Sequence, residues 1–169
     1  MPGHIRIERL DEGHDRSLFD CGEEALNAYL KKQASQDVKR YLSTVYIAKP
    51  AKHSNLQVIG FYTLSTAQME ASSLPVEIIK KLPRYAYMPA FRIGRLAVHN
   101  ANQKMGVGKS LLMDALYKCL KSEIPGIAVI VDAKNEQAQS FYQKYGFIQL
   151  PQQPLKLFIF MKDIKDLFT

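Results

Sequence analysis

Near the middle of the chain stands the stretch Arg95-Leu96-Ala97-Val98-His99-Asn100-Ala101-Asn102-Gln103-Lys104-Met105-Gly106-Val107-Gly108-Lys109-Ser110. Its first four residues end an apolar run that is typical of a β-strand, and a short polar turn follows. Residues 103–110 then bring two glycines to the start of an amphipathic helix. Because the first backbone N–H groups of a helix have no partner within it, such a loop favours an anion, most simply a phosphate.

Two common phosphate-binding motifs do not fit this loop. A nucleoside-triphosphate P-loop that ends in Gly108-Lys109-Ser110 needs a glycine five residues before Gly108, where the chain has Gln103. A dinucleotide-binding fingerprint needs a third glycine where the chain has Leu111. The spacing therefore argues against both motifs.

The pattern Gln/Arg-x-x-Gly-x-Gly/Ala does fit, with Gln103, Gly106 and Gly108 at its fixed positions. It resembles the acyl-CoA pyrophosphate loop of the GCN5-related N-acetyltransferases, the GNAT family. Further along, Asn135 and the segment 141–147 (Phe-Tyr-Gln-Lys-Tyr-Gly-Phe) are similar to a second block of that family. The order and separation of the two blocks also agree with the family.

Composition places the chain among small globular proteins. It has 169 residues, of which 47% are apolar, so we expect a single domain over residues 1–169. No apolar run approaches the roughly 20 residues that span a membrane, and the N-terminus lacks the apolar core of a signal peptide. The two cysteines, Cys21 and Cys119, make no disulfide framework, so we expect a reduced, cytoplasmic setting without membrane contact.

The net charge of +7 is spread unevenly along the chain. No acidic residue lies between Glu77 and Asp114, and the basic residues of this window are Lys80, Lys81, Arg84, Arg92, Arg95, Lys104 and Lys109. The phosphates of CoA would account for Lys104 and Lys109. The other five are candidates for binding a polyanionic acceptor such as RNA, with a solvated surface run as the alternative.

Periodicity and turn residues predict a mixed order of elements. We expect strands at 5–7, 44–48, 56–64, 91–98, 127–131 and 155–161, with 44–48 and 56–64 forming a hairpin and no helix of any length after the last strand. We expect helices from Asp20 (as a capping-box residue with Glu23) to about Ser35, and at 76–82, 109–122 and 135–145, with a loop bracketed by Pro83 and Pro89. This order fits an α/β or α+β layered fold. The resemblance implies a GNAT fold, with a mixed, splayed central β-sheet flanked by helices.

The resemblance also implies a cofactor, acetyl-CoA, and residues that bind it. Main-chain groups of the strand that ends near Val98 would bond the pantetheine arm, and the glycine loop would hold the pyrophosphate. The cofactor-binding residues implied are Leu96, Ala97, Val98, Gln103, Lys104, Met105, Gly106, Val107, Gly108, Lys109, Ser110 and Asn135. No metal site is expected.

Tyr142 is the candidate catalytic residue. Asn135, Ala138 and Tyr142 share one stripe of a helix, and the matching tyrosine of the family protonates the sulfur of the leaving thiolate. The alternative for Tyr142 is an aromatic packing residue with a surface hydroxyl. Phe141 and Tyr145 lie four residues apart on a neighbouring face of the helix, and we expect both to be core residues.

A general base is not evident in the sequence. His99 directly follows the strand, but a turn residue beside the loop is the simpler interpretation. An α-amine, with a pKa of about 8, is substantially neutral near pH 7–8 and needs little help in losing its proton. The missing base thus favours an α-amine acceptor over a lysine side chain.

Three further segments sharpen the resemblance: 19–22 (Phe-Asp-Cys-Gly), 58–65 (Val-Ile-Gly-Phe-Tyr-Thr-Leu-Ser) and 89–98 (Pro-Ala-Phe-Arg-Ile-Gly-Arg-Leu-Ala-Val). Together they are similar to the GNAT toxins of bacterial type II toxin–antitoxin systems. That branch acetylates the α-amine of aminoacyl-tRNA and blocks translation, commonly dimerises, and is held by a ribbon-helix-helix antitoxin. The resemblance implies these partners here, although His99 stands where an aspartate is commoner in that branch.

Two other functions stay open from the sequence. One is a GNAT acetyltransferase that acts on a small-molecule amine or a protein amine. The other is a non-catalytic RNA- or nucleotide-binding module, which would have no affinity for CoA.

Overall fold

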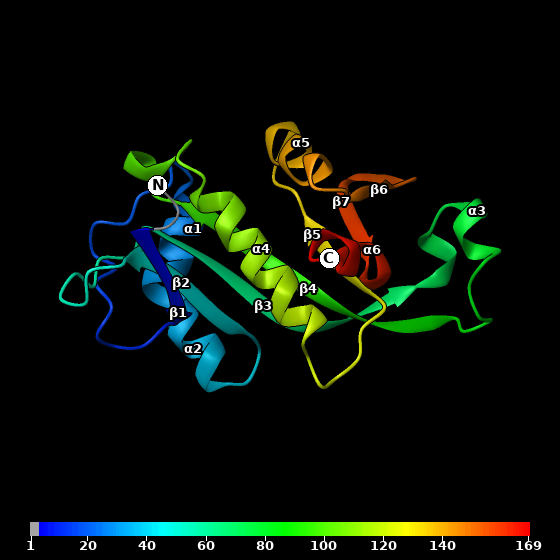
Figure 1. Cartoon of the computed structure of the whole chain (residues 1–169), viewed down its shortest axis with the longest axis horizontal. Coiled ribbons are helices and arrows are strands. Elements are labelled where there is room, and N and C mark those ends of the chain that lie inside the picture. Colours follow the sequence, from blue (N-terminus) through cyan, green and yellow to red (C-terminus); the bar gives the residue numbers. More distant parts are fainter. Residues whose placement is uncertain (1–3) are drawn as a thin grey trace. The chain divides into compact units, whose positions relative to one another are not determined.

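Seven strands form one mixed sheet in the order β1-β2-β3-β4-β5-β7-β6 (Figure 1). The computed structural model describes residues 4–169. The strands are β1 (Ile5–Arg9), β2 (Thr44–Pro50), β3 (Gly60–Glu70), β4 (Tyr87–Val98), β5 (Ala128–Asp132), β6 (Ile148–Leu150) and β7 (Gln153–Phe160). The helical elements are α1 (Glu24–Ala28), the π-helical η2 (Tyr29–Gln33), α2 (Ala34–Lys39), η3 (Ala71–Ser73), α3 (Val76–Ile79), η4 (Asn100–Asn102), α4 (Val107–Leu120), α5 (Glu136–Lys144) and α6 (Met161–Leu167).

The pairing of the strands explains why the sheet is mixed. β1 with β2, β2 with β3, β5 with β7 and β6 with β7 run antiparallel. β4 and β5 run parallel, and their ladder pairs Phe91 with Val129 and ends where Ile93 pairs with Val131. The mixed sheet with flanking helices confirms the predicted fold class. No helix in the described part of the chain is long and apolar enough to cross a membrane.

Contacts group the chain into two units. Unit 1 holds the chain up to Ser65 together with Gly94–Ala115, and unit 2 holds Thr66–Ile93 together with Leu116–Thr169. The candidate cofactor loop lies in unit 1, whereas Asn135 and Tyr142 lie in unit 2.

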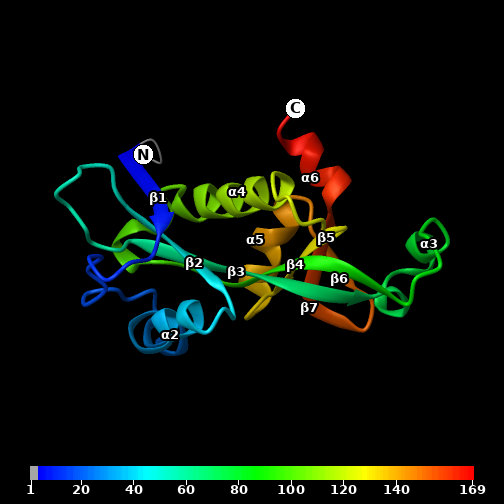
Figure 2. The same ribbon diagram turned by 90° about the horizontal axis from the view of Figure 1, so that it is seen from below.

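Unit 1 is layered because β3 alternates its side chains between two faces. Phe61 packs into a cluster with Phe19, Leu30 and Ile47, which joins α1 and its continuation to the sheet. On the other face, the hydroxyl of Tyr62 donates to Asp114 of α4 at 2.7 Å. Figure 2 shows α2 and the start of α4 on opposite sides of β2 and β3.

Unit 2 has its own apolar cluster. Its buried members come from the far ends of β3 and β4, from β5 to β7 and from the segment before α3: Met69, Leu74, Met88, Ala90, Ala128, Leu150 and Phe158. Ala128, Val129 and Val131 of β5 are buried, as the continuous apolar run predicts, because the strand pairs with β4 on one edge and with β7 on the other.

The predicted start of the first helix at Asp20 is wrong. Gly22 has a φ of +90°, and the Asp20 carboxylate accepts the Gly22 N–H at 2.9 Å and the Asn27 side-chain amide at 3.0 Å. Because Asp20 closes a turn, the helix begins only at Glu24, with Glu23 as an N-cap residue whose side chain does not cap the helix. The helical segment then continues through η2 to Lys39, beyond the predicted end near Ser35.

Most other boundaries differ from the prediction by a few residues, and the largest differences are in β3 and β4. β3 begins at Gly60 rather than Leu56 and ends at Glu70, because its alternation continues through Ala67 and Met69. Pro89 lies inside β4 rather than at the end of a loop. Proline has no N–H to donate, but its carbonyl still accepts the Ile127 N–H at 2.8 Å.

The chain does not end on a strand, so that prediction is also wrong. α6 follows β7 directly, and Ile164 is its one fully buried residue. A seven-residue helix with a single buried position gives almost no periodic signal. The three-residue strand β6 escaped prediction for the same reason of length.

We expect Gly60→Ala to destabilise unit 1. A Cβ at this position would lie 2.9 Å from the Leu111 side chain and 3.1 Å from the Ala97 carbonyl oxygen, so β3 and α4 would have to move apart. Overpacking of this kind costs about 1–3 kcal/mol of unfolding free energy, which urea denaturation measures.

Gly13→Ala is the matched control. A Cβ there meets only the Asp11 carboxylate, at 3.2 Å, on an exposed turn. Equal losses of unfolding free energy in the two variants would contradict the close approach of α4 to β3.

Candidate functional site

The loop before α4 has the backbone shape of an anion site. Lys104 and Gly106 both have positive φ, at 63° and 84°, and Val107 is the first residue of α4. The first bond of the helix runs from the Ser110 N–H to the Gly106 carbonyl at 3.0 Å. The N–H groups that precede Ser110 therefore have no acceptor in the helix, and they carry its positive dipole end.

The side chains of the loop leave its backbone accessible. Gln103, Lys104, Met105 and Lys109 are exposed, whereas Val107 is buried and anchors the start of α4. A lysine in the left-handed region is strained, and strain of this kind concentrates at functional loops.

The Gln103 side chain fixes the loop from within. Its amide nitrogen donates to the Val98 carbonyl at 2.9 Å and to the Cys21 carbonyl at 3.2 Å. This predicted cofactor residue thus ties the end of β4 to the loop through its side chain.

A segment that the site prediction missed, Phe19–Gly22, holds the other side of the loop. The Asp20 carbonyl accepts the Asn100 N–H at 2.7 Å, and the Asp20 N–H donates to His99 Nδ1 at 3.0 Å. The hydrogen bond from the Gly22 N–H, and then the one from the Asn27 side chain, lower the pKa of the Asp20 carboxyl. The Asp-x-Gly spacing at 20–22 was the available signal, because it is typical of a turn.

His99 has a structural role at this point. It precedes η4, its N–H donates to the Ile59 carbonyl at 2.8 Å, and its ring nitrogen is the acceptor for Asp20. The turn position predicted for His99 is confirmed by these bonds.

Arg95 lies one residue before the predicted Leu96–Val98 segment and stacks on an aromatic ring. Its guanidinium lies 3.6 Å from the centre of the Tyr29 ring, and the Tyr29 hydroxyl donates to Asp37 at 2.8 Å. Burial raises the pKa of Tyr29. The ring fixes the plane of the guanidinium, and the N–H groups at its edge remain able to bind an anion.

In unit 2, Asn135 caps α5. Its side-chain oxygen accepts the Ala138 N–H at 2.9 Å, and the helix ends before Gly146, which has a φ of +99°. The predicted helix at 135–145 is therefore confirmed, with its first and last residues as caps.

Tyr142 is the buried aromatic residue of α5, with 7% of its surface exposed. Its ring packs against Phe141 and Phe147, and its hydroxyl makes no hydrogen bond to any of residues 4–169. The prediction that Phe141 and Tyr145 are core residues is wrong, because both are only partly buried. The buried side of α5 is therefore the side that carries Tyr142, whose ring packs against the buried ring of Phe147.

The electrostatic surroundings keep Tyr142 protonated. Burial, and then the negative charge of Asp132, raise the pKa of its hydroxyl well above the ordinary value of 10. Asp132 forms an ion pair with Arg92 of β4 and lies 4.0 Å from the Lys156 ammonium. Arg92, a predicted RNA-binding residue, thus already has an anionic partner within unit 2.

The remaining predicted RNA-binding residues, Lys80, Lys81 and Arg84, are exposed in the segment after α3. Arg84 lines an open hollow together with Ile79, Leu82, Tyr85 and Tyr87, and the two tyrosines are 67% and 55% exposed. Exposed cations and aromatic rings therefore lie on the same part of unit 2.

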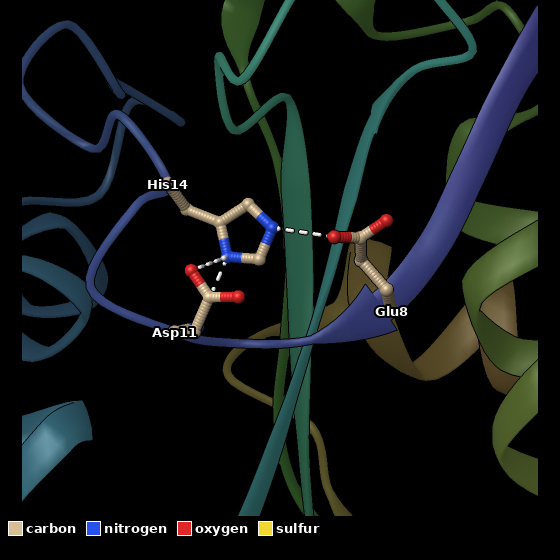
Figure 3. Close-up of side chains that lie close together, drawn as sticks. All are labelled: Glu8, Asp11 and His14. Atoms are coloured by element: carbon tan, nitrogen blue, oxygen red, sulfur yellow. Dashed lines mark hydrogen bonds and ion pairs between the residues drawn. The ribbon is translucent and has the colours of Figure 1, made fainter. Parts of the chain in front are cut away.

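Glu8, Asp11 and His14 form a cluster of metal-ligating residue types at the end of β1 (Figure 3). His14 is buried, its Nδ1 accepts the Asp11 N–H at 3.0 Å, and its Nε2 lies 2.8 Å from the Glu8 carboxylate. Both ring nitrogens have protein partners, so the cluster joins β1 to the following turn as a structural link.

The chain is similar to known proteins over nearly its whole length. The family model described as an acetyltransferase (GNAT) domain matches residues 20–156. A curated relative, the "tRNA-acetylating toxin" of Mycobacterium tuberculosis (strain ATCC 25618 / H37Rv), is 29% identical over 99% of this chain and 98% of its own.

Solved structures extend the comparison to bound states. AtaT complexed with acetyl-methionyl-tRNAfMet is 33% identical, with a TM-score of 0.89 over 98% of this chain and 99% of that one. A tyrosine-to-phenylalanine mutant of the AtaT toxin, bound to acetyl-CoA and the C-terminus of the antitoxin AtaR, is 29% identical, with a TM-score of 0.82 over 98% and 99%. With the family model covering most of its length, this chain belongs to the GNAT acetyltransferases.

Proposed function

We propose that this protein is a toxin of a toxin–antitoxin system that transfers the acetyl group of acetyl-CoA to the α-amine of aminoacyl-tRNA. The similarity over 98% of the chain to AtaT, solved with acetyl-methionyl-tRNAfMet, carries the proposal. An acetylated α-amine no longer accepts a peptide, so the reaction would block translation.

The loop of unit 1 fits the cofactor. Positive φ at Lys104 and Gly106, the unpaired N–H groups at the start of α4, and the exposed ammonium groups of Lys104 and Lys109 suit a pyrophosphate. Acetyl-CoA supplies an activated acetyl thioester. We assign the pyrophosphate to residues 103–110 and the pantetheine arm to main-chain groups of Leu96–Val98, with Asn135 as a further contact.

Tyr142 supplies the proton that the departing sulfur needs. A general acid must hold its proton at working pH, and the raised pKa of the buried hydroxyl satisfies this condition. The hydroxyl makes no hydrogen bond to any described residue, so it can bond to a ligand. We assign no general base, since an α-amine is substantially neutral near pH 8.

Tyr142→Phe is expected to lower the rate of acetyl transfer about 100-fold or more, because the phenyl ring keeps the packing and loses the acid. The measurement uses labelled acetyl-CoA and total charged tRNA, and follows label on each aminoacyl species. Affinity for CoA, measured by calorimetry, should be unchanged.

Tyr145→Phe is the control, because it removes a hydroxyl from a partly exposed tyrosine at the end of the same helix and should leave the rate unchanged. Label on free amines or protein termini, with none on charged tRNA, would overturn the proposed acceptor. Full activity of Tyr142→Phe would overturn the role of the tyrosine.

We assign the basic residues of the window to the tRNA phosphates: Lys80, Lys81, Arg84, Arg92 and Arg95. Of these, Arg92 already pairs with Asp132. Replacing Lys80, Lys81 and Arg84 by alanine should weaken tRNA binding about tenfold. It should also lower the slope of log affinity against log salt concentration by up to about 3, since each phosphate contact releases counterions. Filter binding at several salt concentrations measures both effects.

Lys121, Lys162 and Lys165 provide a control that removes the same charge from other exposed positions of unit 2. An equal loss of affinity in the control would show that net charge alone, and not the segment after α3, attracts the tRNA.

The partners follow from the same proposal. The antitoxin would be a separate ribbon-helix-helix protein, the toxin would act as a homodimer, and a charged-tRNA substrate would place the reaction in the cytoplasm. We also retain residues 1–169 as a single acetyltransferase domain.

A further inference from the structure

Tyr41 has a backbone conformation that its side chain does not favour. Its φ is +59°, in the left-handed region, where bulky residues are genuine outliers. Its side chain is 96% exposed, so packing contributes almost nothing to offset the strain.

The end of α2 imposes this conformation. The Leu42 N–H donates to the Asp37 carbonyl at 2.9 Å, and the Tyr41 N–H donates to the Val38 carbonyl at 3.1 Å. These two bonds form a Schellman motif, in which the position of Tyr41 is usually glycine. Glycine would satisfy the fold at lower cost, so the tyrosine ring has a use outside the fold.

Exposed apolar residues lie next to Tyr41 in the sequence, and the helical segment that precedes it is rich in cations. Leu42 and Val38 are 60% and 38% exposed. Between residues 25 and 43 the charged side chains are Lys31, Lys32, Asp37, Lys39 and Arg40, and the single carboxylate accepts bonds from Tyr29 and Gln33. An exposed ring at the end of a helical segment with four exposed cations, Lys31, Lys32, Lys39 and Arg40, suits a planar group on a polyanion.

The same residues connect Tyr41 to Arg95. Asp37 accepts the Leu42 N–H through its carbonyl and the Tyr29 hydroxyl through its carboxylate, and the Tyr29 ring lies under the Arg95 guanidinium. The strained turn and the predicted phosphate-binding arginine are thus parts of one bonded network in unit 1.

From this geometry we infer that Tyr41 stacks on an unpaired base of the tRNA, at the single-stranded end that carries the amino acid. The inference rests on the proposed function, because the amine to be acetylated lies on that end. Single-stranded bases are the part of an RNA that aromatic side chains can stack on, and the cations of the helical segment pair with the adjoining phosphates.

The chain contains no tryptophan, so Tyr41→Trp introduces a single indole that reports stacking directly. Its fluorescence should be quenched on titration with tRNA. Tyr117→Trp, at a 48% exposed tyrosine of α4, is the matched control and should not be quenched.

A second variant separates function from strain. Tyr41→Gly should raise the melting temperature by about 2–4 °C, since glycine suits the left-handed position. It should also raise KM for charged tRNA about tenfold while kcat and CoA affinity stay the same, and Tyr41→Phe should keep the wild-type KM.

Two results would overturn the inference: an unquenched Tyr41→Trp variant, or a Tyr41→Gly variant with the wild-type KM for charged tRNA. Failure of the wild-type protein to acetylate any charged tRNA would instead overturn the proposed function. Quenching by tRNA tests the stacking without requiring acetyl transfer, so the two failures are distinguishable.

Discussion

The loop before α4 keeps its shape through hydrogen bonds from separate stretches of the chain. The Ile59 carbonyl accepts the His99 N–H, and the Asp20 carbonyl accepts the Asn100 N–H. The side-chain amide of Gln103 donates to the Val98 carbonyl. Lys104 in the left-handed region would not adopt its conformation from local preference alone. Unit 1 therefore acts as a frame that stabilises the loop, and the approach of α4 to β3 at Gly60 is part of that frame.

The parts that could be predicted from sequence are those with a local cause. A few neighbouring residues are enough to predict three of these parts: the strand that ends at Val98, the glycine loop, and the α5 helix with its caps at Asn135 and Gly146. The failures also have local causes: the Asp20 and Glu23 spacing fits a capping box, but Gly22 between them makes a turn. What no single sequence reveals is long-range pairing, such as Arg92 with Asp132 or Asn100 with Asp20.

Helix α5 shows why residue type and spacing alone do not settle which aromatic residue is the candidate proton donor. Phe141, Tyr142 and Tyr145 are three neighbouring aromatic residues, and the motif identifies Tyr142 without predicting its burial. Packing against Phe147 places Tyr142 inside and leaves the other two partly exposed. Burial and the charge of Asp132 then raise the pKa of its hydroxyl, so the phenol keeps its proton at neutral pH.

Backbone strain marks two candidate ligand-binding residues in unit 1, Tyr41 and Lys104. Among residues 4–169, Tyr41 and Lys104 are the two non-glycine residues with positive φ, and both side chains are exposed. Selection for stability alone would favour glycine or asparagine at such positions. Lys104 lies in the loop that we assign to a pyrophosphate, where a positive charge has an evident use. Tyr41 has the same kind of backbone strain as Lys104, and its exposed side chain makes equally little packing to offset that strain. A ligand-binding role therefore explains the strain at Tyr41 in the same way as at Lys104.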